Sequence, residues 1–336
     1  MYSMKKYYYL LSFTIPLSIL VSFLEKGYWS FFALLYAFAF LPALELLLPS
    51  IKENKTLLQE EEIKKDRFYD LILWLMVPIQ FGLLFIFCHI FQSDPLSIFE
   101  RVGLITAMGL GCGVLGINVA HELGHRNNKF EEILAKLLLS TSLYWHFFIE
   151  HNRGHHKNVS TPKDPETSRF NESLYAFYFR SIKQSFISAF KIDQKEMIKA
   201  LSIQFLLVFS IYRFFGEWAF IGFIFSSIIG IILLESVNYI EHYGLVRREI
   251  TPSRFEKVLP EHSWNSDHLL SRAVLFDLSR HSDHHSNVAR KYQILRHHDT
   301  SPQMPTGYPG MILLALIPPL WFRIMNKKIH HLKFPR

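Results

Sequence analysis

Long apolar stretches without a charged residue dominate this sequence and limit the folds that are open to it. A bilayer core about 30 Å thick needs about 20 helical residues to cross it. Four of the stretches are long enough, and two shorter ones, 200–212 and 218–234, form the centres of two more spans. We predict an all-α integral membrane protein with six transmembrane helices. The expected spans are 7–24, 27–44, 71–93, 102–121, 200–216 and 218–241.

The two remaining blocks, 122–199 and 242–336, carry most of the basic residues. With the N-terminus inside, all but three of the 36 Lys and Arg residues lie on the inner side, as the positive-inside rule requires. We therefore expect a protein of the cell inner (cytoplasmic) membrane, with both termini and a helical cap on the cytoplasmic side. This orientation accounts for the net charge of +7, so no nucleic-acid partner is needed.

Three segments of the cap have a recognisable character. Residues 137–149 are apolar enough for a short helix, and 170–190 mix aromatic with basic residues, as an interfacial helix would. Residues 300–322 lack charge but contain five prolines, which favours a broken or interfacial segment over a seventh span. No internal repeat or linker divides the chain, so we expect residues 1–336 to form a single domain.

Seventeen histidines are the second unusual feature, because nine of them form four short boxes. Two boxes lie at the inner ends of the fourth and sixth predicted spans, which brings sequence-distant boxes to one membrane face. The spacings i, i+3 and i+4 place imidazoles on one side of a helix, so His121 with His125, and His151 with His155, can each hold one ion. The nine candidate metal ligands are His121, His125, His151, His155, His156, His242, His281, His284 and His285.

The number of ligands bears on the metal. A catalytic zinc ion takes three protein ligands and a water, whereas nine histidines shared between two ions give four or five each. Two irons fit this count best, and copper remains open, since imidazole suits both metals. The first box, residues 121–125, also matches the zinc-protease pattern H-E-x-x-H, with Glu122 as general base, but that alternative leaves seven clustered histidines without a role.

Polar residues near the boxes are candidates for orienting the ligands, because metal-bound histidines usually donate their second N–H to a carboxylate or carbonyl. Glu235, Asn238 and His242 share one helical face, and an ionisable residue inside a span indicates function. Four other histidines have an ordinary interpretation as single polar residues, namely His89, His146, His330 and His331, while His262, His268, His297 and His298 are more open. The candidate orienting residues are Glu122, Glu150, Asp164, Glu235, Asn238, Glu241, Asp267 and Asp283.

Several segments resemble the membrane-bound alkane 1-monooxygenases. They are HELGHR (121–126), EHNRGHHKNVSTPKDPETSR (150–169), NYIEHYGLVRRE (238–249), RHSDHHSNVARKYQILR (280–296) and the tail PTGYPGMILLALIPPLWFRIM (305–325). The stretch NYIEHYGL separates these hydroxylases from the fatty-acyl desaturases, which share the histidine boxes. Arg272 and Ser279 depart from the family pattern, and neither is a candidate ligand.

The resemblance implies a non-haem di-iron monooxygenase whose iron ligands correspond to the nine histidines named above. It would use O2 to convert the terminal methyl of a medium- to long-chain n-alkane into a 1-alkanol. Electrons would come from rubredoxin and an NAD(P)H-dependent rubredoxin reductase. A fatty-acyl desaturase or a related alkyl- or methyl-aromatic hydroxylase is the alternative function.

An oily substrate is expected to enter from the lipid bilayer through an apolar channel between the helices. Trp29, Phe32 and Tyr36 lie on one face of the second span and are candidates for the channel wall, although such aromatics equally suit lipid contact. Arg290, Lys291 and Arg296 follow the last box and suit either an acidic electron carrier or anionic lipid.

Overall fold

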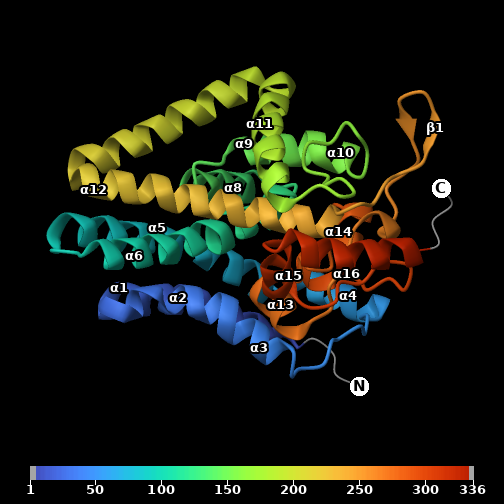
Figure 1. The fold of residues 1–336 in the computed structure, drawn as a ribbon, viewed down its shortest axis with the longest axis horizontal. Helices are drawn as coiled ribbons and strands as arrows, with labels where there is room; N and C mark the ends of the chain where they lie inside the picture. Colours follow the sequence, from blue (N-terminus) through green and yellow to red (C-terminus); the bar gives the residue numbers. More distant parts are fainter. Residues whose placement is uncertain (1–4, 333–336) are drawn as a thin grey trace.

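The computed structural model describes residues 5–332, which are mostly helical (Figure 1). Five stretches are long and apolar enough to cross a membrane. They are Lys6–Glu25, Gly27–Glu45, Phe68–Ser93, Ile98–Gly124 and Gln194–His242. The last of these, α12, turns back at Gly216 into a hairpin whose arms, 194–215 and 217–242, are the fifth and sixth predicted spans (Figure 1). The predicted all-α membrane fold is confirmed.

The spans are built from shorter helical pieces. The first joins a 3₁₀ segment, Lys6–Phe13, to α1 (Thr14–Glu25). The second contains the 3₁₀ turn Gly27–Phe31, α2 (Phe32–Leu35), the π-helical turn Tyr36–Phe40 and α3 (Leu41–Glu45). The third is α5 (Phe68–Ser93). The fourth joins α6 (Ile98–Gly111), the π-helical stretch Cys112–Asn118 and α7 (Val119–Gly124).

Small residues let the fourth span and the second arm of α12 pack closely. A Cβ atom added to Gly230 of α12 would lie 2.6 Å from the Cβ atom of Cys112, and one added to Gly109 would lie 2.5 Å from Ile229. Close backbone approach of this kind is typical of helix pairs in membranes, where small side chains maximise packing. The contact brings the ends of both spans that carry His121 and His242 to the same end of the bundle.

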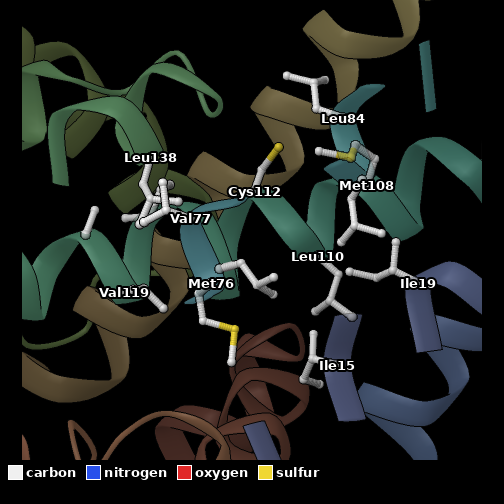
Figure 2. Close-up of a cluster of buried hydrophobic side chains, with 14 of the residues drawn as sticks. Ile15, Ile19, Met76, Val77, Leu84, Met108, Leu110, Cys112, Val119 and Leu138 are labelled. Atoms are coloured by element: carbon white, nitrogen blue, oxygen red, sulfur yellow. The ribbon is translucent and has the colours of Figure 1, made fainter. Parts of the chain in front are cut away.

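Apolar side chains from α1, α5, α6 and α8 fill the centre of the bundle (Figure 2). Ile19, Met76, Met108 and Leu138 are all nearly or fully buried there. The outer faces carry exposed apolar residues instead, such as Phe85 of α5 and Phe205 of α12. An exposed apolar belt around a packed apolar core is what a helix bundle in lipid requires.

The cap consists of short helices and a hairpin at one end of the bundle (Figure 1). Its helices are α4 (Leu57–Lys65), α8 (Lys129–Ser140), α9 (His146–Glu150), α10 (His156–Asn158), α11 (Leu174–Ile192), α13 (Leu269–Val274), α14 (His281–Ser286), α15 (Tyr308–Ala315) and α16 (Pro318–His331). A π-helical turn covers His151–His155, and 3₁₀ turns cover Pro260–His262 and Tyr292–Ile294. Strands β1 (Glu249–Thr251) and β2 (Arg254–Phe255) pair antiparallel.

The structure corrects one cap prediction and refines two others. The helix expected over 137–149 is divided between α8 and α9, because Leu143 adopts a positive φ of 52° in the intervening turn. The segment 170–190 is largely helical, as α11. The proline-rich segment 300–322 contains α15 and the start of α16, and these two helices meet at 120°, in agreement with the expected broken segment.

Candidate metal centre

The nine box histidines come together as two adjacent clusters inside the cap. The five-histidine cluster contains His121, His125, His151, His156 and His284, and the four-histidine cluster contains His155, His242, His281 and His285. Within each cluster the candidate ligand atoms lie within 4.8 Å of one another. The clusters touch, since the rings of His156 and His285 stack with their centroids 4.4 Å apart. The division into five and four agrees with the expected sharing of nine ligands between two ions.

All nine rings turn the same atom, Nε2, towards a neighbouring ring of their own cluster. The Nε2–Nε2 distance is 2.9 Å between His121 and His284 and also between His151 and His156. In the other cluster it is 3.1 Å between His242 and His281. A metal ion about 2.1 Å from each of two imidazole nitrogens would hold them about 3.0 Å apart at a right angle and about 3.4 Å apart at a tetrahedral angle. The nitrogen positions therefore fit a metal in each cluster.

Four different elements supply the rings. His121 and His125 lie at the end of α7, and His242 is the last residue of α12. The second box lies on the π-helical turn that follows α9, and the last box forms α14. Because α7 and α12 are held together by the glycine contacts of their spans, two boxes meet at the foot of the bundle, and the cap folds the other two against them.

Two of the spacing predictions are wrong in detail. His151 and His155 were expected to bind one ion, but they belong to different clusters. The reason is the π-helical turn, whose i→i+5 bonding aligns His151 with His156 and turns His155 away. In α14 the three rings do not share one side, since His284 joins the five-histidine cluster and His281 and His285 join the other.

The protonation states also suit metal binding. Burial lowers the pKa of His284 to about 3, and it lowers the pKa values of His151, His156, His281 and His285 well below the usual range. Neutral imidazoles keep a lone pair on Nε2, which is the form that binds a metal. His155 is the exception, because burial lowers its pKa but the charge and hydrogen bond of the adjacent Asp164 raise it above the usual value.

Buried acids lie behind the rings and add to the case for cations. Burial, with repulsion from Asp164, raises the pKa of Glu150 to about 7, and burial with repulsion from Glu150 raises that of Glu166 well above its ordinary value. Glu235 is also fully buried nearby, where it accepts hydrogen bonds from Tyr144 and Ser181. Metal cations bound at the neutral rings would offset this concentration of acidic groups.

Two of the candidate orienting residues touch a cluster histidine directly. An oxygen of Asp164 lies 2.9 Å from Nδ1 of His155. Glu241 has one oxygen 3.2 Å from Nε2 of His281, and its other oxygen accepts a hydrogen bond from Tyr308.

The other candidates make different contacts. Glu122 pairs with Arg126, Asp267 with Arg280 and His297, and Asp283 with Arg290 and His298, while Glu150 accepts a hydrogen bond from Ser188. Asn238 lines the pocket described below. Glu122 is thus occupied by an arginine, and this leaves it unsuited to act as the general base of a zinc protease.

Glu166 is a site residue that the sequence reasoning missed. Its oxygen Oε2 lies 3.8 Å from Nδ1 of His151 and 3.7 Å from Nδ1 of His155. The residue follows the second box in a turn, where a charged side chain ordinarily faces solvent. A usable signal was its place two residues after Asp164, in a stretch where both side chains can turn back to the box.

The other histidines lie outside the two clusters. His89 is exposed and stacks on Phe85, and His146 packs against Tyr144 and Phe186. His297 and His298 are held by the carboxylates of Asp267 and Asp283. The ordinary interpretation of His89 and His146 as single polar residues agrees with these contacts.

An apolar pocket ends at the clusters. Its inner end is formed by His121 and His151 of one cluster and His281 of the other. The walls are mostly aliphatic and come from the second, fourth and sixth spans and from α13 and α15. Representative wall residues are Phe38, Leu41, Leu110, Val114, Leu233, Val237, Val274 and Ile312.

The structure does not bring Trp29, Phe32 and Tyr36 to this pocket. Trp29 is 56% exposed, and the three rings form a row, with centroids 5.6 Å and 6.2 Å apart. The same span contributes Ala37 and Phe38 to the pocket instead. The π-helical turn at Tyr36–Phe40 changes which residues face inward, and this shift is not visible in an α-helical pattern.

Comparison with known proteins places the chain among membrane enzymes that share these histidine boxes. A family model described as fatty acid desaturase matches residues 97–315, which include all four histidine boxes and the pocket's inner end. Alkane 1-monooxygenase 2 of Alcanivorax borkumensis is 38% identical to this chain, over 98% of the chain and 92% of its own length. Alkane 1-monooxygenase of Pseudomonas putida is 36% identical, over 97% of the chain and 85% of its own length.

A more distant relative is the xylene/toluene monooxygenase hydroxylase component XylM of Pseudomonas putida. It is 28% identical, over 92% of this chain and 84% of its own length. Identity is therefore higher to the alkane enzymes, and it extends over nearly the whole chain. The chain belongs to the membrane-bound alkane 1-monooxygenase family.

Proposed function

We propose that the chain is an alkane 1-monooxygenase that oxidises the terminal methyl of medium- to long-chain n-alkanes to 1-alkanols. The balanced reaction takes one alkane, O2, two electrons and two protons, and gives one 1-alkanol and one water. The single observation that carries the proposal is an apolar pocket that ends at two histidine clusters. The names of the relatives support the same substrate class.

We propose the nine histidines as ligands of two iron ions. His121, His125, His151, His156 and His284 would hold one ion, and His155, His242, His281 and His285 the other. Iron bound there would supply the O2 activation that a strong, unpolarised C–H bond requires. Asp164 would fix the tautomer of His155 by accepting its Nδ1–H.

The pocket residues would bind and orient the substrate. An alkane offers no polar handle, so its position depends on the shape of an apolar wall. The wall residues exclude water along the chain, and only the terminal methyl would reach the ring atoms of His121, His151 and His281. The exposed apolar faces of the spans suit entry of the alkane from the bilayer.

We propose rubredoxin, reduced by an NAD(P)H-dependent rubredoxin reductase, as the electron source, on the cytoplasmic side of the inner membrane. Arg290, Lys291 and Arg296 are at least partly exposed on the cap surface and are the candidates for an acidic carrier. Each is also paired with a carboxylate of this chain, from Asp283, Asp70 and Glu60 respectively, which moderates their free charge.

Reconstitution of the purified protein tests this function. The protein is loaded with ferrous iron and supplied with rubredoxin, reductase, NADH and a series of alkanes, and the products are identified by gas chromatography. We expect about two irons per chain and 1-alkanols as products. Alkenes or unsaturated acyl chains would indicate a desaturase, and preferential oxidation of methyl-aromatics would indicate the activity that the name XylM describes.

The zinc-protease alternative has its own test in Glu122→Gln. Because Glu122 pairs with Arg126, we expect this variant to lose stability but to hydroxylate alkanes when folded. Zinc-dependent peptide cleavage that disappears in Glu122→Gln would contradict the monooxygenase proposal.

A further inference from the structure

The turn that follows the second histidine box carries two carboxylates back to that box. Asp164 accepts a hydrogen bond from Nδ1 of His155, with 2.9 Å between nitrogen and oxygen. It accepts a second one from the backbone N–H of Glu166, with 3.1 Å between nitrogen and oxygen. The hydroxyl of Thr167 also donates to Asp164. These bonds fix the backbone of the turn, and the direction of the Glu166 side chain follows from it.

The Glu166 side chain is buried beside that of Glu150, and its oxygens meet no N–H donor within hydrogen-bond distance in residues 5–332. Its closest donors are Nδ1 of His151, at 3.8 Å, and Nδ1 of His155, at 3.7 Å. Nδ1 of His151 is itself buried without a partner among the described residues. A buried carboxylate and a buried ring nitrogen left apart are both costly, so a small approach that joins them is favourable.

The candidate ligand atoms of His151, His155 and Glu166 also lie within 4.8 Å of one another, but both histidines already direct their other ring nitrogen at a cluster. His151 and His155 turn their Nε2 atoms into the two clusters, where Nε2 of His151 is 2.9 Å from that of His156 and Nε2 of His155 is 3.2 Å from that of His285. An imidazole that binds a metal through Nε2 keeps its proton on Nδ1. Both Nδ1 atoms are therefore donors. Asp164 accepts from that of His155, and Glu166 carries the nearest acceptor oxygen for that of His151.

We propose that Glu166 is a positioning residue that orients His151 and, together with Asp164, links a ligand of each metal cluster through one turn. This inference rests on the proposed metal centre. His155 already has a close acceptor in Asp164, so the main effect of Glu166 falls on His151 and the five-histidine cluster. Without Glu166 the His151 ring is free to rotate, and this makes His151 a weaker metal ligand.

Mössbauer spectroscopy of the full chain loaded with ⁵⁷Fe(II) tests the proposal, together with iron titration. Loss of an outer carboxylate typically weakens metal binding by about 10- to 100-fold. In Glu166→Ala we expect a loss of that size at one iron and a changed signal from that iron. Glu166→Gln retains an acceptor oxygen and should restore most of the affinity. Asp164→Asn should alter the other iron's signal.

Glu172→Gln is the matched control, because Glu172 lies in the same segment but pairs with Arg180. It should leave both iron signals unchanged. If Glu166→Ala does not fold, Glu166→Asp takes its place, since it withdraws the carboxylate by one methylene and should give an altered signal at the same iron.

Wild-type affinity and spectra in a folded Glu166→Ala or Glu166→Asp protein would overturn the inference while leaving the metal centre intact. A wild-type protein that binds no iron would instead overturn the proposed function. The two failures are therefore distinguishable.

Discussion

At the scale of single residues, the candidate site is a group of nine largely buried imidazoles, of which His155 has a close carboxylate partner in Asp164. The sequence predicts which histidines take part, because nine of seventeen fall at ligand spacings and these nine converge. It does not predict their division between clusters. An α-helix and a π-helical turn can have the same sequence, and the difference of one residue per turn moves His155 from one cluster to the other.

The cluster histidines should be essential individually. His284→Ala removes one Nε2 from the five-histidine cluster, and we expect both the iron content per chain and the hydroxylation rate to fall. His89→Ala is the control, because His89 is exposed and lies outside both clusters. Metal analysis and product assay check this. Equal iron content in the two variants would contradict the ligand assignment.

At the scale of elements, the span ends bring the boxes together, and the turns between spans set the geometry. Four spans were predictable from long charge-free runs, whereas the fifth and sixth, which form the α12 hairpin, were predicted from shorter ones. The course of the second span was harder to predict. An α-helical pattern places Trp29, Phe32 and Tyr36 on one face, but the 3₁₀ and π-helical segments of the span bring Ala37 and Phe38 to the pocket instead.

The α12 turn depends on Gly216, whose φ of 84° and ψ of −178° are essentially restricted to glycine. We expect Gly216→Ala to destabilise the protein by about 1–3 kcal/mol. A Cβ there meets no atom within 4 Å, so the cost is backbone strain alone. Gly82→Ala, in the middle of α5, also meets no atom and should not destabilise. Thermal unfolding in detergent compares them, and equal melting temperatures would contradict the argument.

The pocket wall should limit the length of the alkane. Val237→Phe adds a ring to the wall between the second and sixth spans, so we expect yields from the longest accepted alkanes to fall at least about tenfold relative to short ones. Trp29→Ala, on the exposed aromatic row, should leave the distribution of chain lengths unchanged. Competition among alkanes of graded length, followed by gas chromatography, measures this. A larger shift in Trp29→Ala would restore that row as the channel wall.

At the scale of the whole molecule, metal and fold stabilise each other. The pKa of His284 is about 3 in the folded metal-free protein, whereas the pKa of a histidine in the unfolded chain is about 6.5. Below pH 6.5 the unfolded state binds more protons, so the metal-free fold has full stability above pH 6.5. It then loses up to about 1.4 kcal/mol per pH unit from this ring as the pH falls.

Unfolding of metal-free and iron-loaded protein between pH 5 and 8 checks this sign. Iron should raise the melting temperature at every pH, and most strongly above about pH 6.5, because protons compete for the same nitrogens. A metal-free protein that is more stable at pH 5 than at pH 7.5 would contradict the assignment of neutral, buried rings.

Helix α14 supplies histidines to both clusters, and this has a consequence for biosynthesis. His281, His284 and His285 complete both clusters, yet they are the last of the nine rings to leave the ribosome. A nascent chain that has inserted every span still lacks one ligand in one cluster and two in the other. Neither ion can therefore be captured in full coordination before α14 has emerged from the ribosome, and a premature stop before α14 yields a membrane-embedded but inert product.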